Sequence, residues 1–372
     1  TLEAASLEAN TLQRLFFIAL PQSWRGLAAT AFIIAILSIQ DIALCDLLQL
    51  QTLQEKIYLE FRLPDPRTFH EGQEYLLPAR VAILSILPLT FLGICLYLMT
   101  PLFRELLPSA RDDLQPFRNP HQSLRLPRQI QWAIALFSFG LFLSILLVPS
   151  YFILKHTVSW RLIIPVWHSV VPEYLLTIFL AALTSCLMLP LATVMGWLNL
   201  RGFPPWRLLT AFLLITPAPM IGIAVIWFWN RPVFNEFYDS PFIYVYTWLL
   251  RIVPICSFLF MPCWERLLDG PLHALTRLDG CRGRDWLWYI FRLECADELL
   301  LAWIISFLLC FSELGATFLV QCPGYPTLII RFFTMAHSGF DGAVPGITLL
   351  ILLSAAIPGG LLGLFLQKKL HS

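Results

Sequence analysis

Three charged residues lie inside stretches of the chain that are otherwise apolar: Asp41, Arg251 and Glu313. An ionisable side chain in such a stretch usually faces a cavity or an opposite charge, because removing a charge from water is costly. Asp41 and Glu313 each fit two roles. They either line the outer mouth of a path through a membrane or reach the membrane surface from a helix end. For Arg251 we expect an ion pair with an acid on a neighbouring helix rather than contact with a substrate.

A second candidate is the segment Pro217-Ala218-Pro219-Met220-Ile221-Gly222. Pro and Gly interrupt helices, and membrane transporters place interrupted helices where irregular backbone lines a cavity. Pro219 and Gly222 therefore join Asp41 and Glu313 as candidates for a translocation path. The alternative for this segment is a kink that serves helix packing alone.

The patterns that carry catalytic or metal chemistry are absent from the sequence. No Lys follows a Gly, which excludes the phosphate-binding loop of nucleotide hydrolases. The seven His and nine Cys show no zinc-ligand spacing, and no G-x-S-x-G pattern marks a nucleophile. We therefore expect no enzyme, no metal site and no bound cofactor. If the protein is a pump, a partner supplies the energy.

The composition indicates what kind of element must position these residues. Of the 372 residues, 58% are hydrophobic and 13% are charged, whereas globular domains average about 45–50% apolar and about 25% charged. So few charges cannot cover the surface of a soluble protein of this length, which favours a chain whose partner is the lipid bilayer. The net charge of +1 argues against nucleic acid as a partner.

Apolar runs of membrane-crossing length predict an all-α, polytopic transmembrane helical bundle of about eight spans. The runs cover approximately 24–45, 80–100, 130–151, 174–198, 208–229, 242–262, 299–321 and 344–366. Eight spans place both termini on one side, and that side holds 16 of the 25 Lys and Arg, against eight in the opposite loops. The positive-inside rule then makes the termini cytoplasmic.

A polar loop followed by a span with an acid near its far end occurs twice in the chain. Asp41 follows Glu3 by 38 residues, and Glu313 follows Ala274 by 39 residues. Such duplication predicts two related halves. The boundaries are residues 1–101 for the end of the first half, 102–129 for a cytoplasmic linker, and 130–372 for a second half with six spans and the loop 263–298. We therefore expect the first half to be incomplete, with roughly 150 or more residues and four further spans before it.

The two loops resemble the EAA loops of binding-protein-dependent ABC transporter permeases. The first has Glu3-Ala4-Ala5 and Ile18-Ala19-Leu20-Pro21, with Ala9 where the family has Gly; the second keeps Arg277-Leu278-Asp279-Gly280. The second loop departs from the family in having Ala274-Leu275-Thr276 in place of E-A-A. Beyond it, Ser312-Glu313-Leu314-Gly315-Ala316-Thr317 resembles the end of fused two-half permeases, with iron(III) permeases the most similar. The resemblance covers about 1–101 and 129–372.

The resemblance implies an importer in the bacterial inner membrane. A periplasmic binding protein would deliver the solute, and a cytoplasmic ABC ATPase dimer would bind ATP and drive alternating access. Each EAA-like loop would form a short coupling helix against one ATPase subunit. The docking residues that the resemblance implies are Glu3, Ala4, Ala5, Ala9, Leu275, Leu278, Asp279 and Gly280. An ordinary solvated loop, with Gly280 as a plain turn, is the alternative.

Several functions stay open at this point. Thiamine, sulfate and molybdate permeases of the same superfamily are alternatives to iron(III). A secondary transporter also uses internal repeats and broken spans, but it runs on an ion gradient. A membrane protein without transport activity is the third possibility, because each EAA-like copy is degenerate where the other is well kept.

Overall fold

The computed structural model describes the chain continuously over residues 160–269, 295–338 and 344–371, and elsewhere at isolated positions only. Within these residues the regular structure is helical and no strand occurs. The predicted all-α class is therefore confirmed for this part of the chain. The linker 102–129, most of 1–101 and most of the second EAA-like loop lie outside the described residues. The count of eight spans and the two related halves accordingly remain predictions.

Three of the described helices contain a stretch that is long and apolar enough to cross a membrane: Trp167–Leu200, Phe242–Leu268 and Val344–Leu361. A fourth crossing is possible if two shorter helices, bent by 112° to each other, count as one broken span. These helices indicate a membrane protein. The elements are α9 (Trp160–Leu200), α10 (Pro204–Ile215), α11 (Ala218–Trp229), α12 (Asn235–Tyr238), α13 (Phe242–Asp269), α16 (Ala296–Ser312), α17 (Leu328–His337) and α18 (Val344–His371).

Three predicted spans, 174–198, 242–262 and 344–366, coincide with α9, α13 and α18. The other two in this region need correction. The span predicted over 208–229 is split into α10 and α11, because the chain turns at Thr216 and Pro217 between them. The span predicted over 299–321 ends early: α16 stops at Ser312 and the chain continues in turns.

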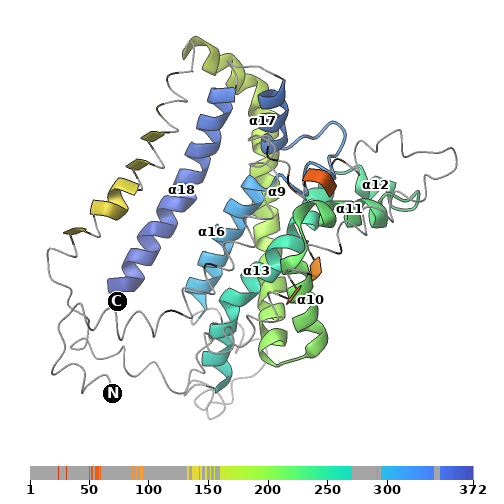
Figure 1. The fold of residues 1–372 in the computed structure, drawn as a ribbon, viewed down its shortest axis with the longest axis vertical. Coiled ribbons are helices and arrows are strands. Elements are labelled where there is room, and N and C mark those ends of the chain that lie inside the picture. The colour runs from red at the N-terminus through yellow and green to blue at the C-terminus, as the bar shows by residue number, and fades with distance from the viewer. Residues whose placement is uncertain are drawn as a thin grey trace.

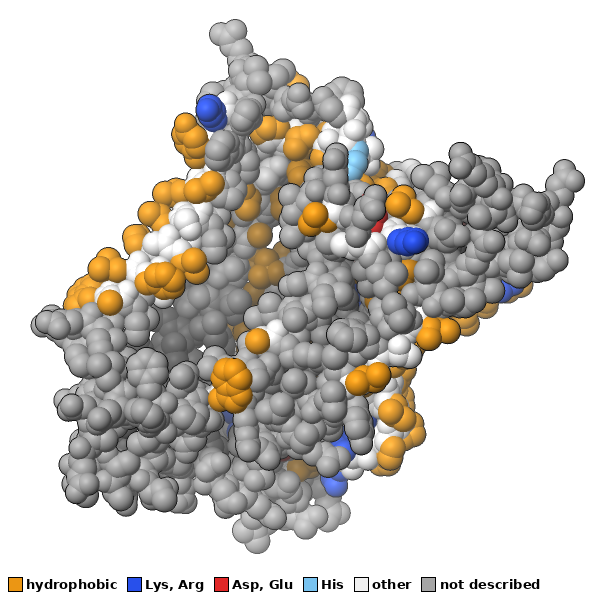
Figure 2. All heavy atoms as spheres, in the orientation of Figure 1, with side chains coloured by type: hydrophobic (Ala, Val, Ile, Leu, Met, Phe, Trp, Pro, Cys, Tyr) orange, Lys and Arg blue, Asp and Glu red, His pale blue; other side chains and the backbone are white. Residues whose placement is uncertain are grey.

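The core lies where α13 packs along α9 and α16 (Figure 1). Its largest members are Trp248, Tyr244 and Phe260, which are all fully buried on α13. The opposite face of α9 exposes large apolar side chains at helical spacing, as a lipid-facing surface requires. They are Leu175, Phe179, Leu187, Leu191 and Val194. Hydrophobic side chains also predominate over charged ones in the described part of the face in Figure 2.

The ends of α13 and α16 that flank the second EAA-like loop are joined side by side. Cys263 and Cys295 form a disulfide, with their Cα atoms 6.1 Å apart. One turn further along α13, Arg266 pairs with Glu298 of α16 at 2.5 Å. The Trp264 indole N–H donates to the Thr193 carbonyl of α9 at 2.9 Å. The end of α13, before the loop, and the start of α16, after it, therefore lie next to each other.

Candidate functional site

The Glu313 carboxylate explains why α16 ends where it does. Glu313 follows the last residue of the helix in an extended conformation, and its side chain turns forward along the chain. One carboxylate oxygen, Oε1, accepts a hydrogen bond from the Ala316 N–H at 3.0 Å, and Oε2 accepts from the Thr317 N–H at 3.0 Å. This is the geometry of an N-cap, in which a side-chain oxygen satisfies the free N–H groups of the following turn.

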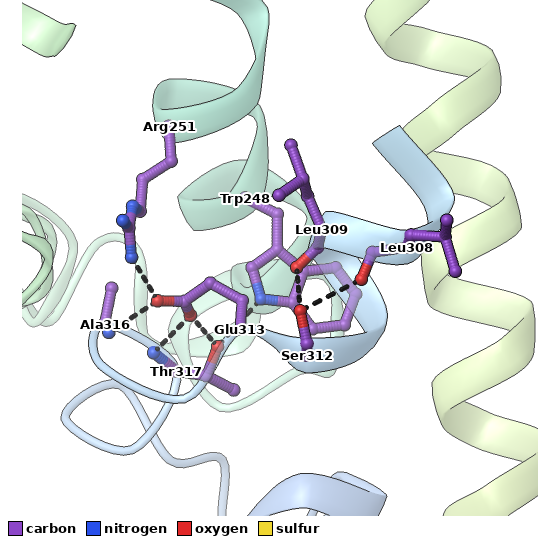
Figure 3. A network of polar contacts seen from close by, with 8 residues as sticks. All are labelled: Trp248, Arg251, Leu308, Leu309, Ser312, Glu313, Ala316 and Thr317. Carbon is purple, nitrogen blue, oxygen red and sulfur yellow. Dashed lines mark hydrogen bonds and ion pairs between the residues drawn. The ribbon is translucent and has the colours of Figure 1, made fainter. Parts of the chain in front are cut away.

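α13 holds the capped turn at two points one helical turn apart (Figure 3). Arg251 Nη1 lies 2.5 Å from Glu313 Oε1, and the two side chains are only 17% and 7% exposed. The Trp248 indole N–H donates to Thr317 Oγ1 at 2.8 Å, and that hydroxyl in turn donates to Glu313 Oε2. The expected pairing of Arg251 with an acid on a neighbouring helix is confirmed. Both oxygens of the acid are occupied within the protein.

The break between α10 and α11 packs directly against this turn. Ala218 begins α11, and a Cβ added at Gly315 would lie 2.8 Å from the Ala218 Cβ. A Cβ at Gly222 would lie 3.0 Å from Leu319 Cβ and 3.1 Å from the Ala316 carbonyl oxygen. Only glycine leaves room for this approach of two backbones. α11, which follows the bend of 112° after α10, therefore packs directly against the Glu313 turn.

Three of the four predicted path residues thus lie on α11 or in the turn that packs against it. Pro219 and Gly222 are buried on α11, and Glu313 is buried in the turn that α11 meets. The fourth, Asp41, lies outside the described residues, and so do the eight predicted docking residues of the EAA-like loops. The described residues therefore locate a candidate site at the α11–α13–α16 junction.

Two further contacts of the junction were missed by the sequence reasoning. The Tyr244 hydroxyl donates to the Tyr325 carbonyl at 3.1 Å and accepts from the Cys322 N–H at 2.8 Å, which holds the loop after the turn. Trp248 was also missed. Tyr244, Trp248 and Arg251 are spaced by four and three residues, so they share one face of α13. That spacing, read outward from the charged Arg251, would have found them.

The loop beyond the turn is also held by a hydrogen bond to the residue that follows α12. The Cys322 thiol donates to the Asp239 carbonyl at 2.8 Å. Burial raises the pKa of the Cys322 thiol, and the nearby Asp239 carboxylate raises it further. The thiol therefore stays protonated near neutral pH and remains a hydrogen-bond donor rather than a nucleophile.

The junction combines the Arg251–Glu313 ion pair with two helices, α10 and α11, that meet at a sharp bend. Among the residues that the structure describes, no three His, Cys, Asp or Glu side chains gather where they could hold a metal ion. The Arg251–Glu313 pair is costly to separate, because both side chains are largely shielded from water and each would lose a close opposite charge. The arrangement fixes the position of α11 relative to α13 and the end of α16.

Comparison of the sequence with known protein families and with curated proteins finds no match in either. The resemblance to importer permeases therefore depends on the residues quoted for it.

Proposed function

We propose that this chain is the permease subunit of a binding-protein-dependent ABC importer in the bacterial inner membrane. It passes a small solute, with iron(III) as the first candidate, and is itself not an enzyme. The observation that carries the proposal is the packing of the broken span α10–α11 against the Glu313 turn. Membrane transporters build their substrate paths from such discontinuous helices.

The energy comes from a separate cytoplasmic ATPase dimer that binds ATP, and a periplasmic binding protein delivers the solute. The ATPase docks on the loop 263–298 through Leu275, Leu278, Asp279 and Gly280, and on the first EAA-like loop. The contact between α13 and α16 beside the loop supports this assignment, because two helices joined by the Arg266–Glu298 ion pair can transmit a displacement of the loop to their other ends. The Arg251–Glu313 pair joins the same two helices further along.

Uptake measurements in cells test the proposal. Cells that lack or express the full chain receive radiolabelled iron(III), with parallel samples given thiamine, sulfate or molybdate. We expect uptake of one solute to require the chain, to continue when an ionophore collapses the ion gradients while ATP is maintained, and to stop when ATP is depleted. Uptake that stops with the ionophore alone would identify a secondary transporter. Equal uptake with and without the chain would favour a membrane protein that does not transport these solutes.

The docking assignment has its own variant. Gly280→Arg places a long charged side chain in the EAA-like motif and is expected to abolish ATP-dependent uptake while the chain still reaches the membrane. Gly270→Arg is the matched control, because it puts the same side chain in the same loop outside the motif. Equal loss in both variants would contradict docking at Gly280.

A further inference from the structure

The short turn between α9 and α10 has a fixed backbone. The Phe203 N–H bonds to the Leu198 carbonyl at 3.4 Å, and the Gly202 N–H bonds to the Asn199 carbonyl at 3.2 Å. This pair of bonds is the Schellman motif, which ends a helix with a left-handed residue. Gly202 fills that position with a φ of 78°. Side chains that flank the turn are therefore presented in a defined geometry.

Two arginines are gathered at this turn. Arg207 Nε donates to the Asn199 carbonyl at 2.9 Å, which lays its guanidinium over Gly202, with Nη2 only 3.3 Å from where a Cβ would be. Arg201 lies over the Trp197 ring, with its guanidinium carbon 5.8 Å from the ring centroid. Both arginines are exposed, and within the part of the chain that the structure describes neither forms an ion pair. Two positive side chains thus flank one turn, and neither has an anionic partner among the described residues.

α10 continues from the arginines as an exposed apolar surface. Its 12 residues span about 18 Å at 1.5 Å per residue, slightly more than half of the roughly 30 Å apolar thickness of a bilayer. Its exposed large side chains are Trp206, Leu208, Leu209 and Phe212, of which Leu208 is 71% and Phe212 is 56% exposed. The surface therefore has a cationic end and an apolar length matched to one leaflet.

We propose that the α9–α10 turn and the exposed side of α10 bind one anionic phospholipid. Its phosphate lies on Arg201 and Arg207, and its acyl chains run along Leu208 and Phe212. Arginine favours phosphate because its guanidinium offers two parallel N–H donors, and a headgroup with net negative charge complements two guanidinium groups better than a zwitterionic one. The proposal requires that the chain lie in a bilayer, and it is independent of transport.

Lipid retention measures this binding. The full chain is purified in detergent, exposed to equal amounts of phosphatidylglycerol and phosphatidylcholine, and examined by native mass spectrometry. We expect a preference for phosphatidylglycerol that falls about fivefold for each arginine changed, in Arg201→Gln and in Arg201→Gln/Arg207→Gln. Arg231→Gln is the matched control, because Arg231 is also exposed and its Nε also donates to a carbonyl one turn back, that of Trp227 at 3.2 Å.

Further variants separate a lipid site from a phosphate site. Leu208→Asn/Phe212→Asn should weaken phosphatidylglycerol binding and leave Arg201 and Arg207 in place. Displacement of the lipid by millimolar inorganic phosphate would overturn the proposal in favour of a free-phosphate site. An equal loss in Arg231→Gln, or no preference for phosphatidylglycerol in the unchanged chain, would overturn it as well. Because Arg207 supports the turn, Arg201→Gln alone decides the case if the double variant unfolds on heating at a lower temperature.

Discussion

Glu313 satisfies two demands with one carboxylate: it caps the turn that follows α16 and neutralises Arg251 of α13. A carboxylate with both oxygens occupied is not free to bind a passing solute while the junction is closed. If Glu313 takes part in translocation, it does so by holding the turn under α11 and releasing it. At the scale of single residues, the pair and the glycines that let the backbones meet are the places to test.

Removing the Glu313 charge should destabilise the protein strongly. In Glu313→Gln the largely buried Arg251 loses the carboxylate that lies against it, and we expect a loss of about 3 kcal/mol in the free energy of unfolding. Thermal unfolding in detergent, followed by tryptophan fluorescence, measures the loss. The double variant Arg251→Met/Glu313→Gln removes both charges and should recover part of it. If the loss in the double variant equals the sum of the losses in Arg251→Met and Glu313→Gln, the two residues do not interact.

A side chain at Gly222 should destabilise the protein, whereas a side chain at a glycine with open space around it should not. In Gly222→Ala the new methyl group meets the Ala316 carbonyl oxygen and Leu319 Cβ at 3.0–3.1 Å, and we expect a cost of about 1–3 kcal/mol. Gly359→Ala on α18 is the control, because a Cβ there has no neighbour within 4 Å. The same unfolding measurement compares the two. Equal stability of both variants would contradict the close approach of α11 to the turn.

At the scale of the element, the apolar runs predicted α9, α13 and α18, because twenty or more apolar residues in a row have few alternatives to a buried or lipid-facing helix. The runs could not predict where α16 ends. Hydropathy continues past Ser312 through Leu314, Phe318 and Val320, while the helix is stopped by a carboxylate that prefers to cap the next turn. Which side chains meet across helices depends on packing that a single sequence does not record.

The Cys263–Cys295 contact offers a test of how α13 and α16 flank the loop. A protease site inserted in the loop between them should, after mild oxidation and cleavage, give two fragments that stay linked until a reductant is added. Cys263→Ser should give fragments that separate at once. If the loop is cytoplasmic, as we propose, the bridge should require oxidation, because thiols on that side of a membrane are normally kept reduced. Fragments that separate without a reductant in the unchanged chain would mean that the two helix ends lie apart.

At the scale of the whole molecule, the described helices alternate in direction as the predicted spans require. The ends of α9, α13 and α18 and the start of α10 lie toward one end of the molecule, and α17 and the start of α18 lie toward the other (Figure 1). Among the described residues, the first end carries Arg201, Arg207 and Arg266, and the other end carries Arg331 on α17. That the first end is cytoplasmic stays a prediction from the charge count of the whole chain. If α9 and α13 both cross the membrane, α10 and α11 have to carry the chain from the end of α9 to the opposite side, where α13 begins.

Labelling from each side of the membrane distinguishes a helix pair that crosses it from a pair that turns back within it. Phe203→Cys precedes α10 and Asn235→Cys follows α11, both at exposed positions, in a chain whose nine native cysteines are replaced by Ser. If the bent pair is one broken span, a membrane-impermeant maleimide should label Phe203→Cys only in inverted vesicles and Asn235→Cys only in right-side-out vesicles. Labelling of both from the same side would make α10–α11 a re-entrant pair. It would also contradict the parallel directions of α9 and α13, which end toward the same end of the molecule (Figure 1).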